Sequence, residues 1–563
     1  MPSLLSSRTR SLPVVGQIVA VLLVGFLCAV GHAASHGAAP SRKHASAPVA
    51  SSAIADRLLP ILTSPALSQS HVGVRITTLD GRVLFAWHDL ERFTPASNTK
   101  LLTTAAASAL LPVDTLTWTT RLVTDGTVDS GGTLHGNLIL LGSGDPTMSS
   151  RNYPYRSHRD AAQHPLAPRD PLADFSSLCD QLAARGIRAI DGNVIGDDTL
   201  FTWEPYGVGW GWDDIVWSYG APVSALTLDD NVVRLHVAAG ANGSTTAAWT
   251  PPTPFYTLEN SARAATGAAS RLSTGPDTGP DTGLNTGLDR MPGSRLVRLW
   301  GAIPPDGYTA PIAIEDPAEF AAQSLRMLLT QRGIPVSGTA TARHRLSMDT
   351  TDYAVEQAQP LALHRVALET FAAPVDGRQV LATHQSPPVV EDIVVTNKVS
   401  QNLHAELLLR LLGRTLGSDG SYAQGVRVVR QFLLQAGVPP EDFFFHDGSG
   451  MSMSDVITPR AYTTLLAYAA HQPWGAQWRR SLPVGGEDGT LVARFGDTAL
   501  NGRIEAKTGS LSEVSTLSGY MTAASGKTLV FSILVNGHLP DNAHEHATIE
   551  AIDKICLAAA AAE

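Results

Sequence analysis

The regular hydrophobic patterns of this chain fall into two blocks, one before residue 118 and one after residue 390. A long stretch of short strands and turns separates them. A chain of 563 residues is too long for one hydrophobic core, so we expect about three or four domains. Hydrophobic residues make up 44% and charged residues 16%, which is typical of a folded globular protein. The net charge of -10 offers no basic surface and argues against nucleic acid as a partner.

Both blocks show recognisable secondary-structure patterns. Hydrophobic residues alternate with others over residues 72–76 and 83–87, and Asp80-Gly81 between them predicts a β-hairpin. A helix rich in Leu and Ala is expected at about 97–111. The second block predicts helices at 396–415 and 420–436, strands at 513–522 and 527–536, and a final helix at 543–560.

The middle region, residues 119–389, mixes short strands, turns and a few helices, one of them predicted at 317–332. It contains a tandem repeat of four-residue units at 274–289, rich in Thr, Gly and Asp, with Pro in its first two units. Gly and Pro at this density do not pack a core, so residues 262–294 are predicted to be a mobile insertion without chemistry.

The N-terminus has the pattern of a secretion signal. Arg8 and Arg10 precede an apolar run over residues 14–30, and Gly31 and Ala33 suit the positions before a cleavage site. We expect a signal peptide at 1–33, a linker at 34–50 and an exported protein, periplasmic or in the cell envelope. The alternative is a retained membrane anchor, because the apolar run approaches the length of a spanning helix.

Cysteine and histidine patterns give little sign of a disulfide framework or a metal. Cys179 and Cys556 remain after the signal, either as a pair or as two separate buried thiols. In His544-Glu545-His546 the spacing places the two histidines on different helix faces, so we interpret it as a solvated helix start. We expect no metal and no cofactor.

Ser97-Asn98-Thr99-Lys100 is the first pattern with chemical meaning, at the start of the predicted helix. A spacing of three places the serine oxygen and the lysine nitrogen on one helix face. A serine hydroxyl needs a base to become a useful nucleophile. Only six of the 41 basic residues are Lys, and Arg cannot act as a general base, so a lysine kept at position 100 suggests that role. The alternative is a surface lysine after a serine cap.

Two further patterns follow in the second block. Lys507-Thr508-Gly509, followed by Ser510, precedes a predicted strand and can offer an ammonium, a hydroxyl and accessible backbone to an anionic peptide end. Taken alone, the Lys-Thr-Gly pattern would be interpreted as an ordinary turn that leads into a strand. Ser400-Gln401-Asn402 lies in a predicted helix and gains meaning only from its position between the other two patterns.

In this order, Ser-x-x-Lys, Ser-x-Asn and Lys-Thr-Gly resemble the signature of penicillin-binding proteins and serine β-lactamases. The roughly 300-residue gap after the first motif resembles the class C low-molecular-mass penicillin-binding proteins, the D-alanyl-D-alanine carboxypeptidase/endopeptidase family. Segments around residues 144–147, 191–194, 209–212, 221–231, 447–452 and 482–491 also resemble that family.

The resemblance implies an α+β fold of the penicillin-binding/β-lactamase type. Residues 51–118 and 390–563 would form one transpeptidase-like domain, an antiparallel sheet flanked by helices. Residues 119–389 would be an inserted region rich in β structure, with a smaller nested domain at about 231–297 that carries the repeat.

The resemblance also implies a serine-type D-alanyl-D-alanine carboxypeptidase/endopeptidase. Ser97 attacks the carbonyl between two D-alanines, Lys100 takes its proton, and Ser400 relays a proton to the departing amine. The peptidoglycan stem peptide is the substrate and β-lactam antibiotics are trapped as slowly hydrolysed acyl-enzymes. Loose association with the membrane or wall is compatible with this activity.

The remaining implied roles concern binding. Asn402 and Thr508 orient the substrate, Lys507 and Thr508 face its carboxylate, and Gly509 allows close approach. Backbone N–H groups of Ser97 and Ser510 hold the oxyanion. Asp145 meets the amine of a diamino-acid side chain, or is a turn aspartate before proline.

Two rival classes stay open at this stage. A β-lactamase or esterase uses the same motifs, although the long insertion argues against it. A non-catalytic wall-binding protein would have a dead site, although all three motifs are intact. A Ser-His-Asp hydrolase lacks a supporting nucleophile elbow.

Overall fold

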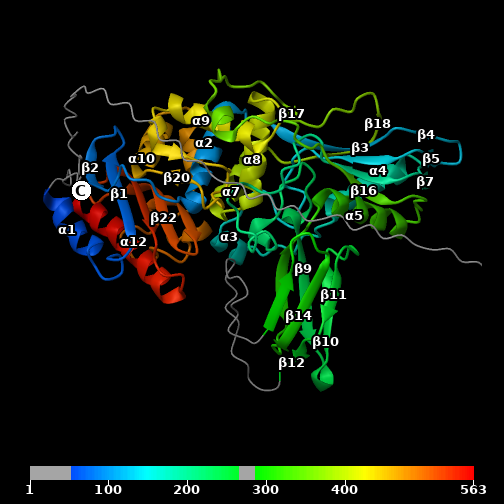
Figure 1. The fold of residues 1–563 in the computed structure, drawn as a ribbon, viewed down its shortest axis with the longest axis horizontal. Helices are drawn as coiled ribbons and strands as arrows, with labels where there is room; N and C mark the ends of the chain where they lie inside the picture. Colours follow the sequence, from blue (N-terminus) through cyan, green and yellow to red (C-terminus); the bar gives the residue numbers. More distant parts are fainter. Residues whose placement is uncertain (1–51, 266–285) are drawn as a thin grey trace, which may run out of the picture. The chain divides into compact units, whose positions relative to one another are not determined.

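The computed structural model describes residues 52–265 and 286–563 (Figure 1). The predicted signal peptide and linker lie outside these residues, as do residues 274–285 of the repeat. The first described element is helix α1, Ser52–Leu62. No helix within the two described ranges combines the length and apolar character that a membrane span requires.

A five-stranded antiparallel sheet joins the two blocks of the sequence. Its strand order is β2-β1-β23-β22-β21, so the N-terminal hairpin pairs directly with the C-terminal strands. Its strands are β1 His71–Thr78, β2 Val83–Trp87, β21 Ile504–Leu511, β22 Val514–Thr522 and β23 Thr528–Asn536. The predicted hairpin and the two predicted strands near the C-terminus are confirmed.

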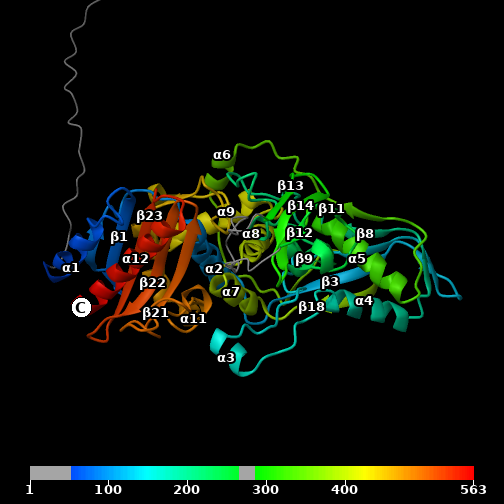
Figure 2. The ribbon, with the colours of Figure 1, turned by 90° about the horizontal axis from the view of Figure 1, so that it is seen from below.

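Both faces of this sheet are buried, and the alternation of side chains along β23 shows how. Phe531 and Ile533 belong to a core shared with α1 and with α12, Asn542–Ala562. Val530 and Leu534 point to the other face, into a core shared with the remaining helices. Figure 2 shows α12 lying along the sheet. The predicted antiparallel sheet flanked by helices, and with it the α+β class, is confirmed.

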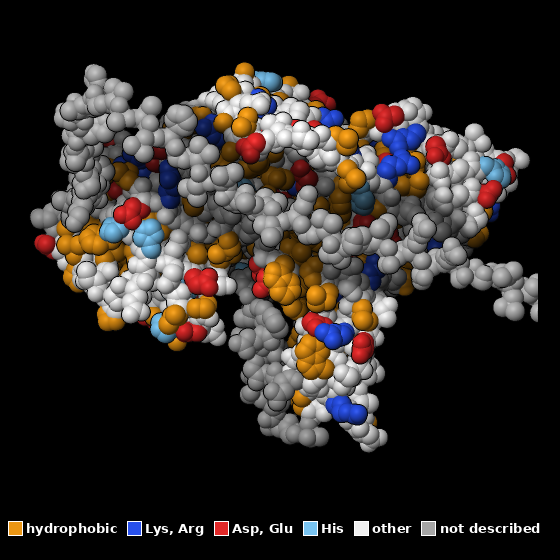
Figure 3. All heavy atoms as spheres, in the orientation of Figure 1, with side chains coloured by type: hydrophobic (Ala, Val, Ile, Leu, Met, Phe, Trp, Pro, Cys, Tyr) orange, Lys and Arg blue, Asp and Glu red, His pale blue; other side chains and the backbone are white. Residues whose placement is uncertain are grey.

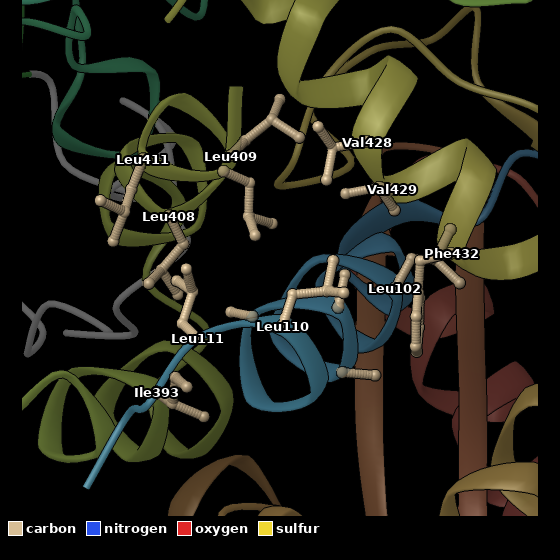
Figure 4. Close-up of a cluster of buried hydrophobic side chains, with 14 of the residues drawn as sticks. Leu102, Leu110, Leu111, Ile393, Leu408, Leu409, Leu411, Val428, Val429 and Phe432 are labelled. Carbon is tan, nitrogen blue, oxygen red and sulfur yellow. The ribbon is translucent and has the colours of Figure 1, made fainter. Parts of the chain in front are cut away.

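The second core contains the helix that follows Ser97. Leu102 and Leu110 of α2 pack against Leu408 and Leu409 of α8 and against Phe432 of α9 (Figure 4). The helices on this side are α2 Thr99–Leu110, α6 Tyr353–Ala358, α7 Val389–Lys398, α8 Asn402–Leu416, α9 Tyr422–Gln435, α10 Pro459–Ala470 and α11 Gly475–Arg480. A two-stranded sheet pairs β19 Phe443–Phe444 with β20 Val456–Ile457.

A six-stranded mixed sheet forms the first part of the middle region. Its order is β16-β8-β6-β3-β17, and β18 also pairs with β3. The strands are β3 Thr117–Thr124, β6 Leu138–Leu141, β8 Val194–Asp197, β16 Ala340–Arg343, β17 Thr370–Phe371 and β18 Gln379–Gln385. Helices α4 Ala173–Ala184 and α5 Pro317–Gln331 pack on it, and the prediction of α5 is confirmed. Short elements beside it are α3 His158–Gln163, β4 Thr127–Val128, β5 Thr133–His135 and β7 Ala189–Asp191.

Two smaller sheets complete the middle region (Figure 1). One has the order β10-β9-β15, and in the other β11, β12 and β13 pair with β14. Their strands are β9 Val232–Ala239, β10 Thr245–Thr250, β11 Thr257–Asn260, β12 Arg263–Ala264, β13 Thr286–Arg290, β14 Leu296–Ile303 and β15 Tyr308–Ala313. The domain boundaries expected from the sequence, near residues 118, 231, 297 and 390, stay predictions.

Two predictions were wrong. Residues 262–294 are not all a coreless insertion, because the last repeat unit forms strand β13, and Leu288 is buried against β14. The predicted helix at 396–415 is two helices, α7 and α8, which break over residues 399–401. Ser400 there has a φ of 61°, in the left-handed region that a helix excludes.

The structure decides the alternative left open for the two cysteines and confirms the interpretation of His544. Cys179 and Cys556 are free, buried thiols. His544 lies in the exposed first turn of α12, where Asp541 accepts hydrogen bonds from its backbone N–H and from that of Ala543.

Candidate active site

Ser97 lies in a strained turn at the N-terminal end of α2. The 3-10 turn Ala96–Asn98 leads into the helix, and Ala96 before the serine has a left-handed φ of 49°. The side chain of Asn98 donates to Thr516 on β22, and Thr516 Oγ1 donates to Pro95 O at 3.0 Å. The sheet therefore holds the turn in a conformation that costs free energy, a feature common at functional sites. Ser97 is partly exposed.

Lys100 lies beneath Ser97 and is fully buried. Its Nζ lies 2.8 Å from Ser97 Oγ, 2.6 Å from Asn402 Oδ1 and 2.8 Å from the carbonyl oxygen of Ser449. The predicted spacing of three places Ser97 and Lys100 on one helix face. Three oxygens from three segments thus fix the position of the amine next to the serine hydroxyl.

The break between α7 and α8 presents Ser400 and Asn402 to the same place. The left-handed Ser400 ends the first helix, and Asn402 begins the second. Asn402 accepts from Lys100 through Oδ1 and donates through Nδ2 to the carbonyl of Tyr219 at 2.9 Å. Its amide orientation is therefore fixed from both ends. Ser400 Oγ accepts a 2.8 Å hydrogen bond from Lys507 Nζ.

Strand β21 carries Lys507, Thr508, Gly509 and Ser510 along the last strand of the sheet. Lys507 is fully buried and also donates to Thr508 O at 2.9 Å, whereas Ser510 is exposed. A side chain at Gly509 would place its Cβ 3.0 Å from the backbone nitrogen of Ser97 and 2.8 Å from Pro95 O. The strand therefore packs directly against the turn that carries Ser97, and only glycine permits this approach.

A loop that the sequence did not single out for catalysis supports Thr508. Thr508 Oγ1 donates to Thr490 Oγ1 at 2.8 Å. Lys398, at the end of α7, is buried and forms an ion pair with the partly buried Asp488, with Nζ–Oδ distances of 2.6 and 2.8 Å. It also donates to Leu482 O. This third rare lysine thus fixes the loop that contacts Thr508.

Buried carboxylates hold a second loop, residues 446–455, against Lys100. Glu406 Oε1 accepts from the backbone N–H groups of Gly448 and Ser449 at 2.9 and 2.8 Å, so it fixes the carbonyl that contacts Lys100. Asp447 accepts from Gly450 N and from the indole of Trp210. Burial, together with the nearby Asp447 charge, raises the pKa of Glu406 to about 7.

Asp145 is not brought together with the other predicted residues. Its carboxylate is fully buried, and Oδ1 accepts from the backbone N–H and the hydroxyl of Thr147 at 2.8 and 2.7 Å. Oδ2 lies 3.4 Å from His384 Nε2. These contacts are those of a turn aspartate, the alternative interpretation, and a role in binding a substrate amine stays a prediction.

Comparison with known proteins agrees with this geometry. The family model described as "D-Ala-D-Ala carboxypeptidase 3 (S13) family" matches residues 54–368 and 364–559. The chain belongs to this family. A D-alanyl-D-alanine carboxypeptidase of Actinomadura sp. is 31% identical over 493 residues, which cover 85% of this chain and 80% of that protein.

A second carboxypeptidase and its solved structure extend the likeness. D-alanyl-D-alanine carboxypeptidase DacB of Haemophilus influenzae is 24% identical over 480 residues, covering 85% of this chain and 88% of that one. The crystal structure of penicillin-binding protein 4 (dacB) from the same organism superposes with a TM-score of 0.66 at 21% identity, covering 89% and 96% of the two chains. The fold of this family member is therefore that of penicillin-binding protein 4.

This member of the carboxypeptidase family also has a buried ionic cluster next to Asn402, which the sequence patterns did not predict. His404 is fully buried, with Nδ1 2.6 Å from Asp392 and Nε2 3.1 Å from Asp230, and Asp230 also pairs with Arg151. These carboxylates outweigh the burial of the imidazole and raise the pKa of His404 to about 9. The cluster joins α8 to the middle region. A lone histidine in an apolar helix pattern carries no signal for it.

Proposed function

We propose that this chain is a serine-type D-alanyl-D-alanine carboxypeptidase/endopeptidase, penicillin-binding, that acts on peptidoglycan peptides through an acyl-enzyme on Ser97. Family membership supports the reaction class. The observation that carries the site assignment is the contact of Lys100 Nζ with both Ser97 Oγ and Asn402 Oδ1.

In the first step, Ser97 Oγ attacks the carbonyl carbon between the two D-alanines as its proton passes to Lys100. The amide of Asn402 and the carbonyl of Ser449 accept from the amine, so one direction of the nitrogen stays aimed at Ser97. A base within hydrogen-bond distance of a hydroxyl meets the geometric requirement for general-base catalysis.

In the second step, the C–N bond breaks and the terminal D-alanine leaves with a proton on its nitrogen. Ser400 Oγ accepts a hydrogen bond from Lys507 Nζ, so its hydroxyl passes a proton to the leaving amine and is resupplied from Lys507. The ammonium of Lys507 and the hydroxyl of Thr508 face the terminal carboxylate. The oxygen of a water molecule then bonds to the acyl carbon as the ester bond to Ser97 breaks. Lys100 returns a proton to Ser97 Oγ, the water proton restores Lys507 by way of Ser400, and the shortened peptide leaves.

The edge of β21 supplies the substrate's backbone contacts. The side of β21 that faces away from β22 pairs with residues 483–485. This pairing ends at Ala506, whose N–H donates to Pro483 O. Beyond that point, an extended peptide adds to the strand at residues 508–510. Gly509 lies against the turn that carries Ser97. The N–H groups of Ser97 and of Ser510, the residue after Gly509, then stabilise the oxyanion.

β-Lactam antibiotics are expected to acylate Ser97 in the same way. The H. influenzae penicillin-binding protein 4 has been solved in complex with a β-lactam, with a TM-score of 0.63 to this chain. A β-lactamase or esterase on the same motifs, or a non-catalytic wall protein, is not favoured by the family match over both sequence blocks. Export to the periplasm or cell envelope, by the signal peptide at 1–33, belongs to the same proposal.

Release of D-alanine from a stem peptide ending in D-Ala-D-Ala tests the proposed activity. The wild type is expected to release one D-alanine per peptide, and Ser97→Ala is expected to release none above background. Full activity of Ser97→Ala contradicts the assignment of the nucleophile. A wild type without activity on any such peptide contradicts the proposed reaction.

A further inference from the structure

A group of metal-ligand side chains lies on the first hairpin, outside the active site. His71, His88 and Glu91 present ligand atoms that all lie within 4.8 Å of one another, the one such group of three found in the described ranges. Figure 3 shows histidine side chains beside an acidic one on the face over β1 and β2. Strands β23 and β22 separate β1 and β2 from β21, so this group is not part of the site around Lys507.

The two imidazoles converge on one carboxylate oxygen. His71 Nε2 lies 2.7 Å and His88 Nδ1 lies 3.2 Å from Glu91 Oε2. Around a tetrahedral ion with metal–ligand bonds of about 2.0–2.2 Å, ligand atoms lie about 3.3–3.6 Å apart. Small side-chain rotations therefore convert this arrangement into a three-ligand site.

The backbone and neighbouring rings fix these side chains. His88 has a left-handed φ of 48°, and the turn closes with a 3.1 Å hydrogen bond from Glu91 N to His88 O, which places His88 and Glu91 together. The His71 ring stacks on Phe93 with centroids 3.9 Å apart, and the His88 ring stacks on Trp87 at 5.0 Å. Such prior ordering lowers the entropic cost of binding an ion.

We propose that His71, His88 and Glu91 bind a divalent transition-metal ion, with Zn²⁺ the best match. Two imidazole nitrogens and one carboxylate oxygen are a donor set that Zn²⁺ takes, and hard cations such as Mg²⁺ prefer oxygen alone. All three side chains are exposed, so water completes the coordination. The ion joins the start of β1 to the turn after β2 and stabilises the hairpin.

His135 provides a matched control on the same chain. It also contacts two acidic residues, but Asp129 meets Nε2 at 3.0 Å and Asp191 meets Nδ1 at 3.3 Å. The two carboxylates lie on opposite sides of the ring and cannot share one ion with it. All three of these side chains are exposed, as in the proposed site.

The test is calorimetric titration of the untagged protein with Zn²⁺, repeated with Co²⁺ while the visible absorption is recorded. We expect one Zn²⁺ per chain with micromolar affinity, a rise in Tm with added Zn²⁺, and Co²⁺ absorption bands of low-coordinate nitrogen and oxygen ligation. His71→Ala and His88→Ala should each weaken binding more than about tenfold, and His135→Ala should not. Acylation by benzylpenicillin should be equal in all variants, which confirms that they are folded.

Two results overturn the proposal. One is a Kd of the wild type for Zn²⁺ in the millimolar range or weaker. The three side chains would then form only ion pairs between Glu91 and the histidines. The other is tight binding that His71→Ala and His88→Ala leave unchanged, which places the ion elsewhere.

Discussion

The Nζ of Lys507 donates a 2.8 Å hydrogen bond to the Oγ of Ser400, although the two residues lie 107 positions apart in the chain. The bond joins the break between α7 and α8 to the edge strand β21. Ser400 occupies a left-handed conformation there, so its hydroxyl reaches the lysine only because the helix is interrupted. The strained serine and the buried lysine thus act as one unit.

Ser400→Ala removes the hydroxyl that carries the proton to the leaving amine. We expect kcat for D-alanine release to fall by about 10²–10⁴-fold, the usual contribution of a positioned acid or base. Steady-state hydrolysis of the stem peptide measures it. Ser418→Ala, an exposed serine beyond α8, is the control and should keep wild-type kcat. Equal rates for the two variants would remove Ser400 from the mechanism.

Lys100→Arg keeps a long side chain with N–H donors but removes the general base, because a guanidinium does not lose its proton. We expect acylation by benzylpenicillin to slow by at least about 10²-fold. The exposed Lys527, in the turn before β23, provides the matched substitution Lys527→Arg, which should acylate at the wild-type rate. Stopped-flow acylation kinetics distinguish the two. A Lys100→Arg variant that acylates normally would show that the base is another group.

Gly509→Ala brings a methyl group against the active-site turn. Its Cβ would lie 3.0 Å from Ser97 N and still closer to Thr516 Oγ1, so the strand or the turn must move. We expect acylation to be largely lost, since a displacement of about 1 Å near the reacting atoms costs about 10²-fold. Gly496→Ala, where the added Cβ has only Gly486 Cα at 4.0 Å, should have no effect.

Glu406 acts through the loop that it supports. Glu406→Leu leaves the N–H groups of Gly448 and Ser449 without their acceptor, frees the Ser449 carbonyl from its position against Lys100 and should reduce acylation. Glu406→Gln keeps a carbonyl acceptor of the same shape and should retain most activity. Thermal unfolding of both variants shows whether a loss of acylation comes from unfolding or from displacement of the Ser449 carbonyl. Equal acylation by both variants would contradict this role.

The buried cluster around His404 predicts how stability changes with pH. The folded protein holds the imidazolium up to about pH 9, whereas the unfolded chain releases the proton near 6.5. The stabilisation is therefore complete below 6.5 and is lost as the pH rises through 9, by at most about 1.4 kcal/mol per pH unit.

Urea unfolding between pH 7 and 9 measures this effect. The wild type should lose free energy of unfolding across the window, and His404→Gln should lose less of it. His546→Gln, which alters an exposed histidine of α12, should follow the wild type. The pKa of His344 is also raised, because Asp198 and Asp316 outweigh its burial. Its titration changes the free energy of unfolding with pH equally in all three proteins. Parallel curves for wild type and His404→Gln would contradict the assigned pKa.

Local patterns predicted the hairpin, α5 and the C-terminal strands because their hydrophobic alternation and turn residues act over a few positions. The break at Ser400 could not be predicted this way. Residues 396–415 have the composition of one continuous helix, and contacts with Lys507 and Tyr219 replace the missing helical turn. Leu288 likewise lies in a sequence typical of a flexible repeat, and burial against β14 makes it part of a strand.

The site itself was predictable where a residue type and its spacing imply chemistry. Ser97 and Lys100 belong to one helix turn, and the rarity of lysine supported a role for Lys100 and Lys507 once each stood inside a motif. The supporting groups were not predictable. Glu406 has the sequence appearance of a surface acid, and only the fold shows that it holds the loop behind Lys100.

The intact mass of the purified protein after brief exposure to benzylpenicillin, beside that of Ser97→Ala, tests the acyl-enzyme on Ser97 most directly. We expect a stable adduct of one benzylpenicillin on the wild type and none on the variant. An adduct on both proteins, or on neither, would contradict the assignment of Ser97 as the acylated nucleophile.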